Sequence, residues 1–197
     1  MRETVLVIGG VRSGKSLFAV ELAGELAGDL PAYFIATARR DRADPAMLER
    51  IERHRVTRPR KRWKTIEEPL DIGAAVLEIE GNPKIRRRPA PPEALILVDC
   101  LPVWLSNMLA LAGDPDSPGF TPRAREVYRA GWYSLATAMG RSRSHLIFVT
   151  NEVGMGVAPP TRLGNVFADL QGDLNHSLAI ACSRVYSLTA GVPVRIR

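Results

Sequence analysis

Short apolar runs alternate along the chain with longer segments in which apolar residues recur at helical spacing. Four runs stand out: "TVLVIGG", "AYFIATA", "ALILVDC" and "HLIFVTN". Continuous apolar runs of this length, rich in β-branched residues, predict strands that are buried on both faces. The segments that follow them, such as "SLFAVELAGELAG" and "LPVWLSNMLALAG", carry the helical period. This alternation predicts an α/β fold in which a mostly parallel sheet is flanked by helices on both faces.

Weaker patterns complete this picture. Residues 44–55 and residues 69–80 each predict a helix, and a further helix is expected over residues 122–139. "RWKTIE" predicts a short strand, and "RVYSLTAGVPVRI" predicts two strands joined by a turn at Gly191. The Pro- and Arg-rich residues 81–93 predict an exposed loop.

The charge excess is concentrated in one segment of an otherwise ordinary chain. The 197 residues suit a single domain, 1–197, and no apolar run reaches the roughly 18 residues needed to span a bilayer. We expect no signal peptide, and we expect Cys100 and Cys182 to be buried thiols of a cytoplasmic protein. Residues 39–64 hold eleven Lys/Arg and four Asp/Glu, which leaves sixteen Lys/Arg and seventeen Asp/Glu elsewhere. This distribution favours a local anion site over a uniformly basic surface for nucleic acid.

The segment "GGVRSGKS", residues 9–16, fits the pattern G-x-x-x-x-G-K-[ST] of a phosphate-binding loop. It follows a predicted strand and opens a predicted helix, which is the context that such a loop requires. Glycines let backbone N–H groups turn inward around a phosphate, Lys15 would reach the β- and γ-oxygens, and the Ser16 hydroxyl would bind Mg²⁺. The alternative, without a role in phosphate binding, is a glycine turn with an exposed lysine. The predicted nucleotide-binding residues are Gly9, Gly10, Val11, Arg12, Ser13, Gly14, Lys15 and Ser16.

Asp99 ends the strand "ALILVDC" and occupies the place of a Walker B carboxylate, which holds Mg²⁺ through a water molecule. Alternatively, its side chain caps the helix that follows, and the two roles do not exclude each other. The guanine-binding sequence N-K-x-D of switch GTPases would follow a late strand, but the corresponding strand here ends "TNEVG". These residues therefore predict a nucleotide site without specifying the reaction.

His54 lies within the basic segment. Spacing alone favours a packed or surface histidine over a nucleophile. The surrounding arginines, however, favour a neutral imidazole and attract phosphate, and a neutral ring nitrogen can attack phosphorus. Arg50, Arg53 and Arg55 could hold a triphosphate, or they could equally form a solvated helix face.

Several long stretches resemble the bifunctional adenosylcobinamide kinase/adenosylcobinamide-phosphate guanylyltransferase family of cobalamin biosynthesis. They are "GGVRSGKS", "YFIATA", "RIERHRVTRP" with the following "TIEEP", "LVDCLPVWLSNML" and "TNEVGMGVAPPTRLGNVFADLQGDLN". The resemblance covers nearly the whole chain. There are two departures from the family pattern: residues 81–93 are longer and more basic, and Pro102 stands where a small hydroxyl residue is more usual.

The resemblance implies a P-loop NTPase fold like the core of recombinase-type ATPases. It implies that adenosylcobinamide is phosphorylated by ATP or GTP, and that GMP is then transferred from GTP to this phosphate with release of pyrophosphate. The guanylyl group would pass through a histidine phosphoramidate, and the matching histidine is His54. Mg²⁺, a corrinoid substrate and a homo-oligomer, a trimer, are also implied, whereas nucleic acid and membrane insertion are not expected.

The remaining acidic residues and the rival functions stay open. The resemblance implies that Glu67 or Glu68 faces the nucleotide, and of the two we choose Glu67. Glu152 could orient Mg²⁺ or substrate, or it could support its own loop. One rival function is a nucleotide-gated nucleic-acid-binding ATPase, although the basic segment offers only Trp63 for stacking. The other is a simple small-molecule kinase, which would release no pyrophosphate.

Overall fold

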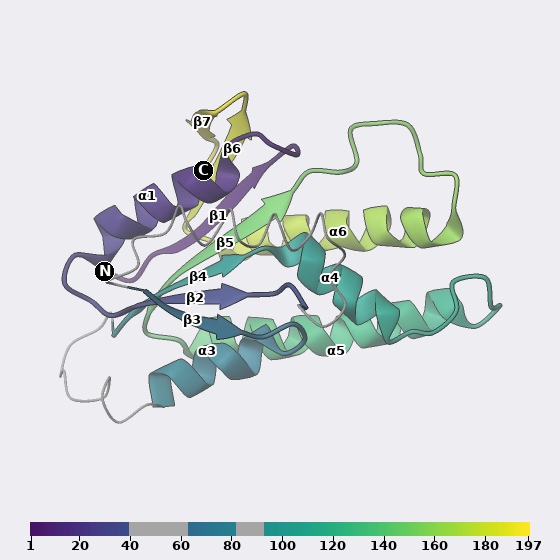
Figure 1. Cartoon of the computed structure of the whole chain (residues 1–197), viewed down its shortest axis with the longest axis horizontal. Coiled ribbons are helices and arrows are strands. Elements are labelled where there is room, and N and C mark those ends of the chain that lie inside the picture. The colour runs from purple at the N-terminus through teal and green to yellow at the C-terminus, as the bar shows by residue number, and fades with distance from the viewer. Residues whose placement is uncertain (40–62, 82–92) are drawn as a thin grey trace.

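A seven-stranded sheet forms the centre of the structure (Figure 1). The computed structural model describes residues 1–39, 63–81 and 93–197, so the predicted helix over residues 44–55, with His54, and nearly all of the predicted basic loop lie outside the described residues. Along the sheet the strands run in the order β3-β2-β4-β5-β1-β6-β7. Neighbouring strands are parallel except for β7, which is antiparallel to β6. The strands are β1 (Thr4–Gly9), β2 (Ala32–Ala36), β3 (Trp63–Glu67), β4 (Leu95–Asp99), β5 (His145–Asn151), β6 (Arg184–Thr189) and β7 (Val192–Arg195).

Helices cover both faces of this sheet, as the sequence predicts. Among the described helices, α1 packs on one face, and α3, α4, α5 and α6 lie on the other (Figure 1). The bounds of these helices are α1 (Lys15–Ala27), α3 (Ile72–Gly81), α4 (Leu101–Ala110), α5 (Phe120–Arg141) and α6 (Arg162–Ala181).

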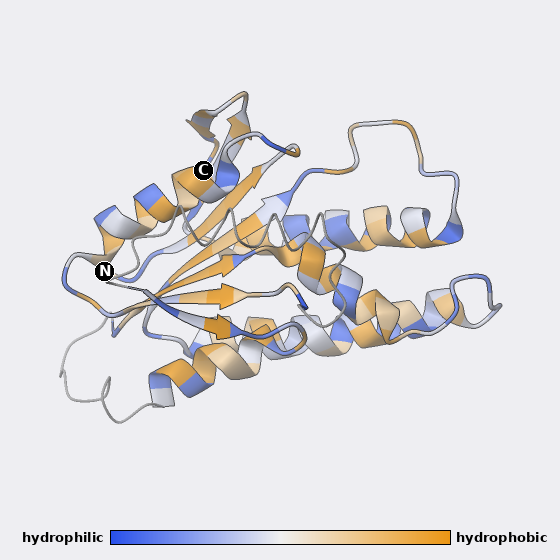
Figure 2. Cartoon of the chain, in the orientation of Figure 1, coloured by the Kyte–Doolittle hydropathy of each residue, from blue (hydrophilic) through white to orange (hydrophobic). Residues whose placement is uncertain are grey.

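Alternation along the strands builds a separate core on each face. In β1, Val5 and Val7 pack with the α1 layer, whereas Leu6 between them packs with the layer of α3 to α6. Successive side chains of a strand point to opposite faces, so a strand that is apolar throughout supplies both cores. Figure 2 shows the result: the central strands are almost uniformly hydrophobic, while the helices carry both hydrophobic and hydrophilic residues.

Local signals explain where several helices begin. The Asp71 carboxylate accepts a hydrogen bond from Ala74 N (2.9 Å) at the start of α3. The Thr161 hydroxyl accepts one from Gly164 N (3.1 Å) at the start of α6. Pro102 lies in the first turn of α4, where its missing N–H is not needed. The proline that departs from the family pattern at this position is therefore compatible with the helix.

Two sequence expectations need correction. Cys182 is buried, and burial raises the pKa of its thiol to about 12, but Cys100 is only half-buried. The helix predicted from residue 122 begins at Phe120, because Pro122 is tolerated in a first turn and does not delimit the helix. None of the described helices is both long and apolar enough to cross a membrane.

Candidate functional site

The predicted site residues that the structure describes lie at one edge of the sheet, because parallel strands place their carboxyl ends together. In the sheet register Gly9 pairs with Asn151, and Asp99 pairs with Val149 on β5 and with Ala36 on β2. β5 thus separates the strand of the phosphate loop from the strand of Asp99. In Figure 1 the loop after β1, the loop between β5 and α6, and the start of α4 all lie at this end of the molecule.

The backbone of residues 9–16 adopts a compact turn that depends on its glycines. Gly14 precedes α1 with φ +89°, a conformation that side chains rarely adopt. A Cβ at Gly9 would overlap the Leu188 carbonyl oxygen of β6 and lie 2.9 Å from Ser13 Oγ. Arg12 is a non-glycine residue with positive φ, at +58°. The first N–H groups of α1 therefore follow a tight glycine turn, as an anion-binding loop requires.

Lys15 is folded onto its own loop. It is only 7% exposed, its Nζ donates to the Gly10 carbonyl oxygen, and it lies 3.5 Å from Ser13 Oγ. The ammonium group is therefore held against the loop backbone, at the start of α1. The alternative of an exposed lysine beside a glycine turn is therefore wrong.

Backbone hydrogen bonds fasten the loop on two sides. Glu152 N donates to the Gly9 carbonyl oxygen (3.2 Å), and Gly191 N donates to the Ser13 carbonyl oxygen (3.1 Å). The first donor follows β5, and the second lies in the turn between β6 and β7. Both neighbours of β1 thus hold the loop that β1 leads into.

Asp99 ends β4 at the predicted edge, and the following residue rather than Asp99 is the N-cap of α4. That residue, Cys100, has extended backbone dihedral angles and no side-chain cap hydrogen bond, and the Asp99–Cys100 peptide bond is cis. The buried Thr37 hydroxyl donates to Cys100 O (2.8 Å) and accepts from Cys100 N (3.1 Å). Asn107 Nδ2 donates to Thr37 O (2.8 Å) and to Pro69 O (3.1 Å). The ends of β2 and β4 are therefore tied together beside the Asp99 carboxylate.

The acidic residues near this edge have different surroundings. Glu67 is exposed at the end of β3, whereas the Glu68 carboxylate accepts hydrogen bonds from Leu70 N and Asp71 N, both at 2.8 Å. Glu152 accepts from Gly154 N (3.1 Å), so in this structure its side chain supports its own loop. The Glu67 side chain therefore lies on the surface, whereas the Glu68 carboxylate fixes the backbone just before α3.

A polar cluster that sequence reasoning missed lies beneath the end of β5. The Thr150 hydroxyl donates to Asn175 Oδ1 (2.7 Å), and Gln171 Nε2 donates to both Thr150 Oγ1 (2.9 Å) and Asn175 Oδ1 (3.0 Å). Asn175 Nδ2 donates to the Asn151 carbonyl oxygen (2.9 Å). All three side chains are buried, so they link α6 rigidly to the strand end beside the phosphate loop. Their only sequence signal is polar residues on the apolar face of a predicted helix.

Two side chains at this edge, those of Ser16 and Asp99, could supply oxygen ligands to a metal ion. Ser16 is the second residue of α1, and Asp99 ends β4 two strands away. One hydroxyl and one carboxylate, with substrate phosphates and water, are the ligand set that Mg²⁺ prefers. Within residues 1–39, 63–81 and 93–197 no group of three or more His, Cys, Asp or Glu side chains could hold a metal ion by itself.

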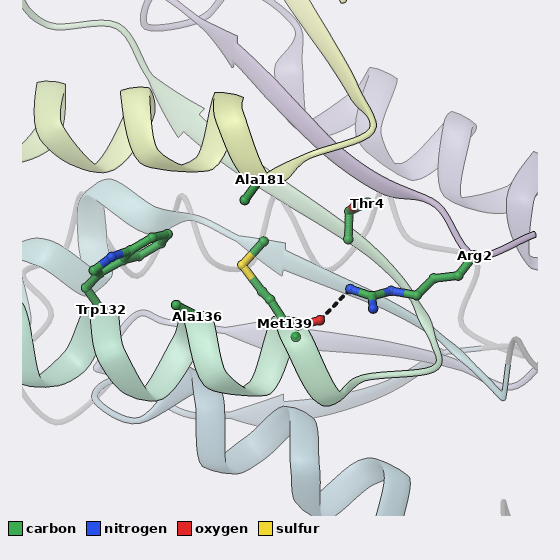
Figure 3. A pocket seen from close by; sticks show the side chains of 7 residues that line it. Arg2, Thr4, Trp132, Ala136, Met139 and Ala181 are labelled. Carbon is green, nitrogen blue, oxygen red and sulfur yellow. Dashed lines mark hydrogen bonds between the residues drawn. The ribbon is translucent and has the colours of Figure 1, made fainter.

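A cavity of about 430 Å³ lies at the opposite edge of the sheet, between α5 and α6 (Figure 3). Thr4, at the start of β1, lines it, whereas the phosphate loop follows the other end of that strand. The Arg2 guanidinium beside it is engaged by the carbonyl oxygens of Ser142 (2.7 Å) and Met139 (2.6 Å). This cavity is therefore separate from the candidate site.

Comparison with known proteins gives a consistent result over the whole chain. A sequence model of the family described as "Cobinamide kinase / cobinamide phosphate guanyltransferase" matches residues 5–196. The bifunctional adenosylcobalamin biosynthesis protein CobP of Pseudomonas aeruginosa is 35% identical over 192 residues, 98% of this chain and 96% of the relative. The corresponding CobU protein of Escherichia coli is 34% identical over 195 residues, 98% of this chain and 99% of the relative.

Solved structures show the fold. One solved ATPase domain superposes with a TM-score of 0.52 at 10% identity, covering 95% of this chain and 69% of that one. An ATPase from the type III secretion system of pathogenic bacteria gives a TM-score of 0.55 at 14% identity, covering 95% of this chain and 51% of that one. At these identities the likeness confirms a P-loop ATPase fold of the recombinase type and nothing about substrates.

Proposed function

This chain belongs to the family of cobinamide kinases and cobinamide phosphate guanyltransferases, and we propose that the carboxyl edge of its sheet is the nucleotide site for its reactions. The observation that carries the proposal is the buried Lys15 inside a glycine turn at the start of α1. The turn, the ammonium group and the helix N-terminus together provide fixed positive potential for a triphosphate. The residues proposed for nucleotide binding are Gly9 to Ser16 with Glu67.

In the kinase reaction the γ-phosphoryl group of ATP or GTP moves to the hydroxyl group of cobinamide. The bond from the γ-phosphorus to the bridging oxygen breaks and the nucleoside diphosphate leaves, a bond to the hydroxyl oxygen forms, and the hydroxyl proton passes to water. Lys15 and the loop amides stabilise the charge that develops on the phosphate oxygens. Ser16 and Asp99 would hold Mg²⁺, which supplies further charge neutralisation when it is bound.

In the guanylyltransfer reaction, an imidazole nitrogen of His54 attacks the α-phosphorus of GTP. The new P–N bond replaces the bond to the leaving pyrophosphate. A phosphate oxygen of cobinamide phosphate then attacks the same phosphorus, the P–N bond breaks, and the free imidazole is restored. Two in-line displacements of this kind replace one difficult transfer. The support for His54 is the match of "RIERHRVTRP" to the family pattern, since the residue lies outside the described part of the chain.

Mass spectrometry of the intact chain after incubation with GTP and Mg²⁺ tests this assignment. We expect the addition of one GMP, mapped to the peptide that contains His54 and absent from His54→Ala. His176→Ala is the matched control, because His176 is an exposed histidine on α6. An adduct that persists in His54→Ala would reject the role of His54. Transfer of the γ-label without any release of pyrophosphate would instead support a simple kinase.

We also propose that the chain forms a homo-oligomer, a trimer. Support comes from exposed apolar side chains near the C-terminus, on and just after the edge strand β7 and at the end of α6. Val192, Val194, Ile196 and Ile180 are between 54% and 62% exposed. Large exposed apolar surfaces mark sites of contact between proteins. Light scattering of the purified chain measures the mass, and a monomer would contradict the proposal.

A further inference from the structure

The turn of the C-terminal hairpin lies directly against the phosphate loop. Gly191 N donates to the Ser13 carbonyl oxygen (3.1 Å), and a Cβ placed at Gly14 would lie 3.4 Å from Gly191 Cα. The turn joins β6 to β7, and its two central residues, Ala190 and Gly191, have φ values of +50° and +84°. Positive φ at both central positions is the geometry of a tight hairpin turn that follows the twist of the strands.

We propose that this turn is a positioning element of the nucleotide site, because it aims the Gly14 N–H at the bound phosphates. The Ser13 carbonyl and the Gly14 N–H belong to one planar trans peptide unit, so they point in opposite directions. Gly191 holds the carbonyl on the hairpin side. The Gly14 N–H is therefore directed away from the hairpin, toward the interior of the loop. This inference rests on the proposed function of the loop as the nucleotide site.

Contacts at Gly9, the first glycine of the phosphate loop, also hold the loop in place. The Leu188 carbonyl oxygen of β6 lies so close to Gly9 that a Cβ there would overlap it. On the opposite side, Glu152 N donates to the Gly9 carbonyl oxygen (3.2 Å), which by the same reasoning directs the Gly10 N–H away from β5. The loop is thus held between β5 and the hairpin, and each side fixes the direction of one N–H group.

The conformation of residue 191 provides a way to disturb this contact alone. At φ +84° a β-branched residue is strongly disfavoured, whereas asparagine tolerates the left-handed region. A Cβ at position 191 meets no atom within 4 Å, so a substitution acts through the turn backbone and not through a clash. Gly113, in the turn between α4 and α5, has φ +94° and equally open surroundings, which makes it the matched control.

The experiment compares equilibrium binding of ATP, with Mg²⁺, to the full-length chain and to Gly191→Val, Gly191→Asn and Gly113→Val, alongside thermal unfolding of each. Both valine variants should lose stability through the same backbone strain. Only Gly191→Val should also bind ATP about tenfold more weakly, as expected for one misdirected donor. Gly191→Asn should restore binding to within about twofold of the parent chain. If Gly191→Val does not fold, Gly191→Ala replaces it, with Gly113→Ala as its control.

The outcomes separate this inference from the proposed function. If ATP binds Gly191→Val and Gly113→Val equally well, or if asparagine at 191 binds as weakly as valine, the hairpin has no positioning role. Lys15→Met, measured in the same assay, tests the site itself. Weaker binding to Lys15→Met with unchanged binding to Gly191→Val rejects only the role of the hairpin. Unchanged binding to Lys15→Met rejects the loop as the nucleotide site, and the hairpin inference with it.

Discussion

The Thr37 hydroxyl contacts both polar backbone atoms of Cys100, donating to its carbonyl oxygen at 2.8 Å and accepting from its amide nitrogen at 3.1 Å. Thr37 is fully buried and follows β2, while Cys100 follows β4, the adjacent strand. One side chain thus fixes the backbone immediately after Asp99. The carboxylate that we propose as a Mg²⁺ ligand is positioned by a residue that never needs to touch the metal.

Replacing Thr37 with valine should therefore lower both stability and the response to Mg²⁺. Valine keeps the shape but removes both hydrogen bonds between the Thr37 hydroxyl and the Cys100 backbone, at a cost of about 2 kcal/mol in the free energy of unfolding. Urea denaturation measures the stability, and kinase activity titrated with Mg²⁺ measures the second effect, which should appear as a higher Mg²⁺ requirement. Thr37→Ser keeps the hydroxyl and should remain close to the parent chain in both assays. A valine variant as stable as the serine variant would contradict the role assigned to these hydrogen bonds.

Lys15→Met should abolish most of the kinase activity without unfolding the protein. Removing a single charged donor aimed at a transition state typically lowers the rate about 100-fold or more. Steady-state transfer of the γ-phosphoryl group to cobinamide measures the loss, and circular dichroism checks the fold. The control is Lys64→Met, because Lys64 is an exposed lysine on β3 whose Nζ lies 5.9 Å from the centre of the Tyr33 ring. Equal losses of kinase activity in the two variants would show that the activity depends on the net charge of the protein and not on the position of Lys15.

The cluster beneath β5 predicts different costs for two buried amides. Asn175→Leu removes a partner from the Thr150 hydroxyl, the Gln171 amide and the Asn151 carbonyl, and should cost about 3 kcal/mol. Gln171→Met removes a side chain whose Oε1 is buried without a hydrogen-bond partner, while Thr150 still donates to Asn175. Its cost should be about 1 kcal/mol or less. Chemical denaturation of both variants decides the order, and a larger loss for Gln171→Met would show that the cluster is assigned incorrectly.

His145 predicts a pH dependence of stability that is unrelated to catalysis. Its Nδ1 accepts a hydrogen bond from Glu3 N (3.0 Å), which requires the unprotonated nitrogen. Burial lowers the pKa of His145 below its ordinary 6.5, against the opposing attraction of the nearby Glu3 carboxylate. The positive charges of Arg2, Arg184 and the N-terminus lower it further.

Below pH 6.5 the unfolded chain therefore binds a proton that the folded chain does not, so stability should fall as the pH is lowered toward the folded pKa. The contribution of this group to the slope is at most about 1.4 kcal/mol per pH unit, and it should be absent above about pH 7.5. Urea unfolding at several pH values measures it. The comparison is with His145→Asn, whose side-chain oxygen can accept the same bond without titrating. An unchanged slope in that variant would remove His145 as the cause.

Much of the fold follows from local patterns in the sequence. Every apolar run predicted to be a strand is one, because strands buried on both faces must be continuously apolar, and "TVLVIG" supplies both cores through alternate residues. The glycine spacing of residues 9–16 likewise predicts a phosphate loop, because few other structures need that pattern beside a strand end. The roles of His54 and Glu67 remain predictions that await the experiments above.

What the sequence could not predict depends on contacts between distant segments. Strand order is not encoded in any single strand, so the position of β5 between β1 and β4 could not be read from local patterns. Thr37 and Asn107 were therefore not recognised as partners, although they are connected by a 2.8 Å hydrogen bond across 70 residues of sequence. The alternative role of Asp99 as a helix cap could not be decided from the sequence either. An acidic residue before a helix resembles a cap, and only the backbone shows that the helix begins one residue later.

The position of β1 in the sheet determines when its strand pairs can form during synthesis of the polypeptide. Its hydrogen-bonded neighbours are β5 and β6, so β1, which is synthesised before both, must wait for residues 145–151 before it has any partner in the sheet. Closure of the sequence-distant pairs comes last, and it carries the largest loop-closure cost. A polypeptide that stops short of the final hairpin would also lack the backbone donor at residue 191. Fragments that end before this hairpin should therefore bind nucleotide more weakly, and ribosome-bound fragments should be the species in greatest need of chaperones.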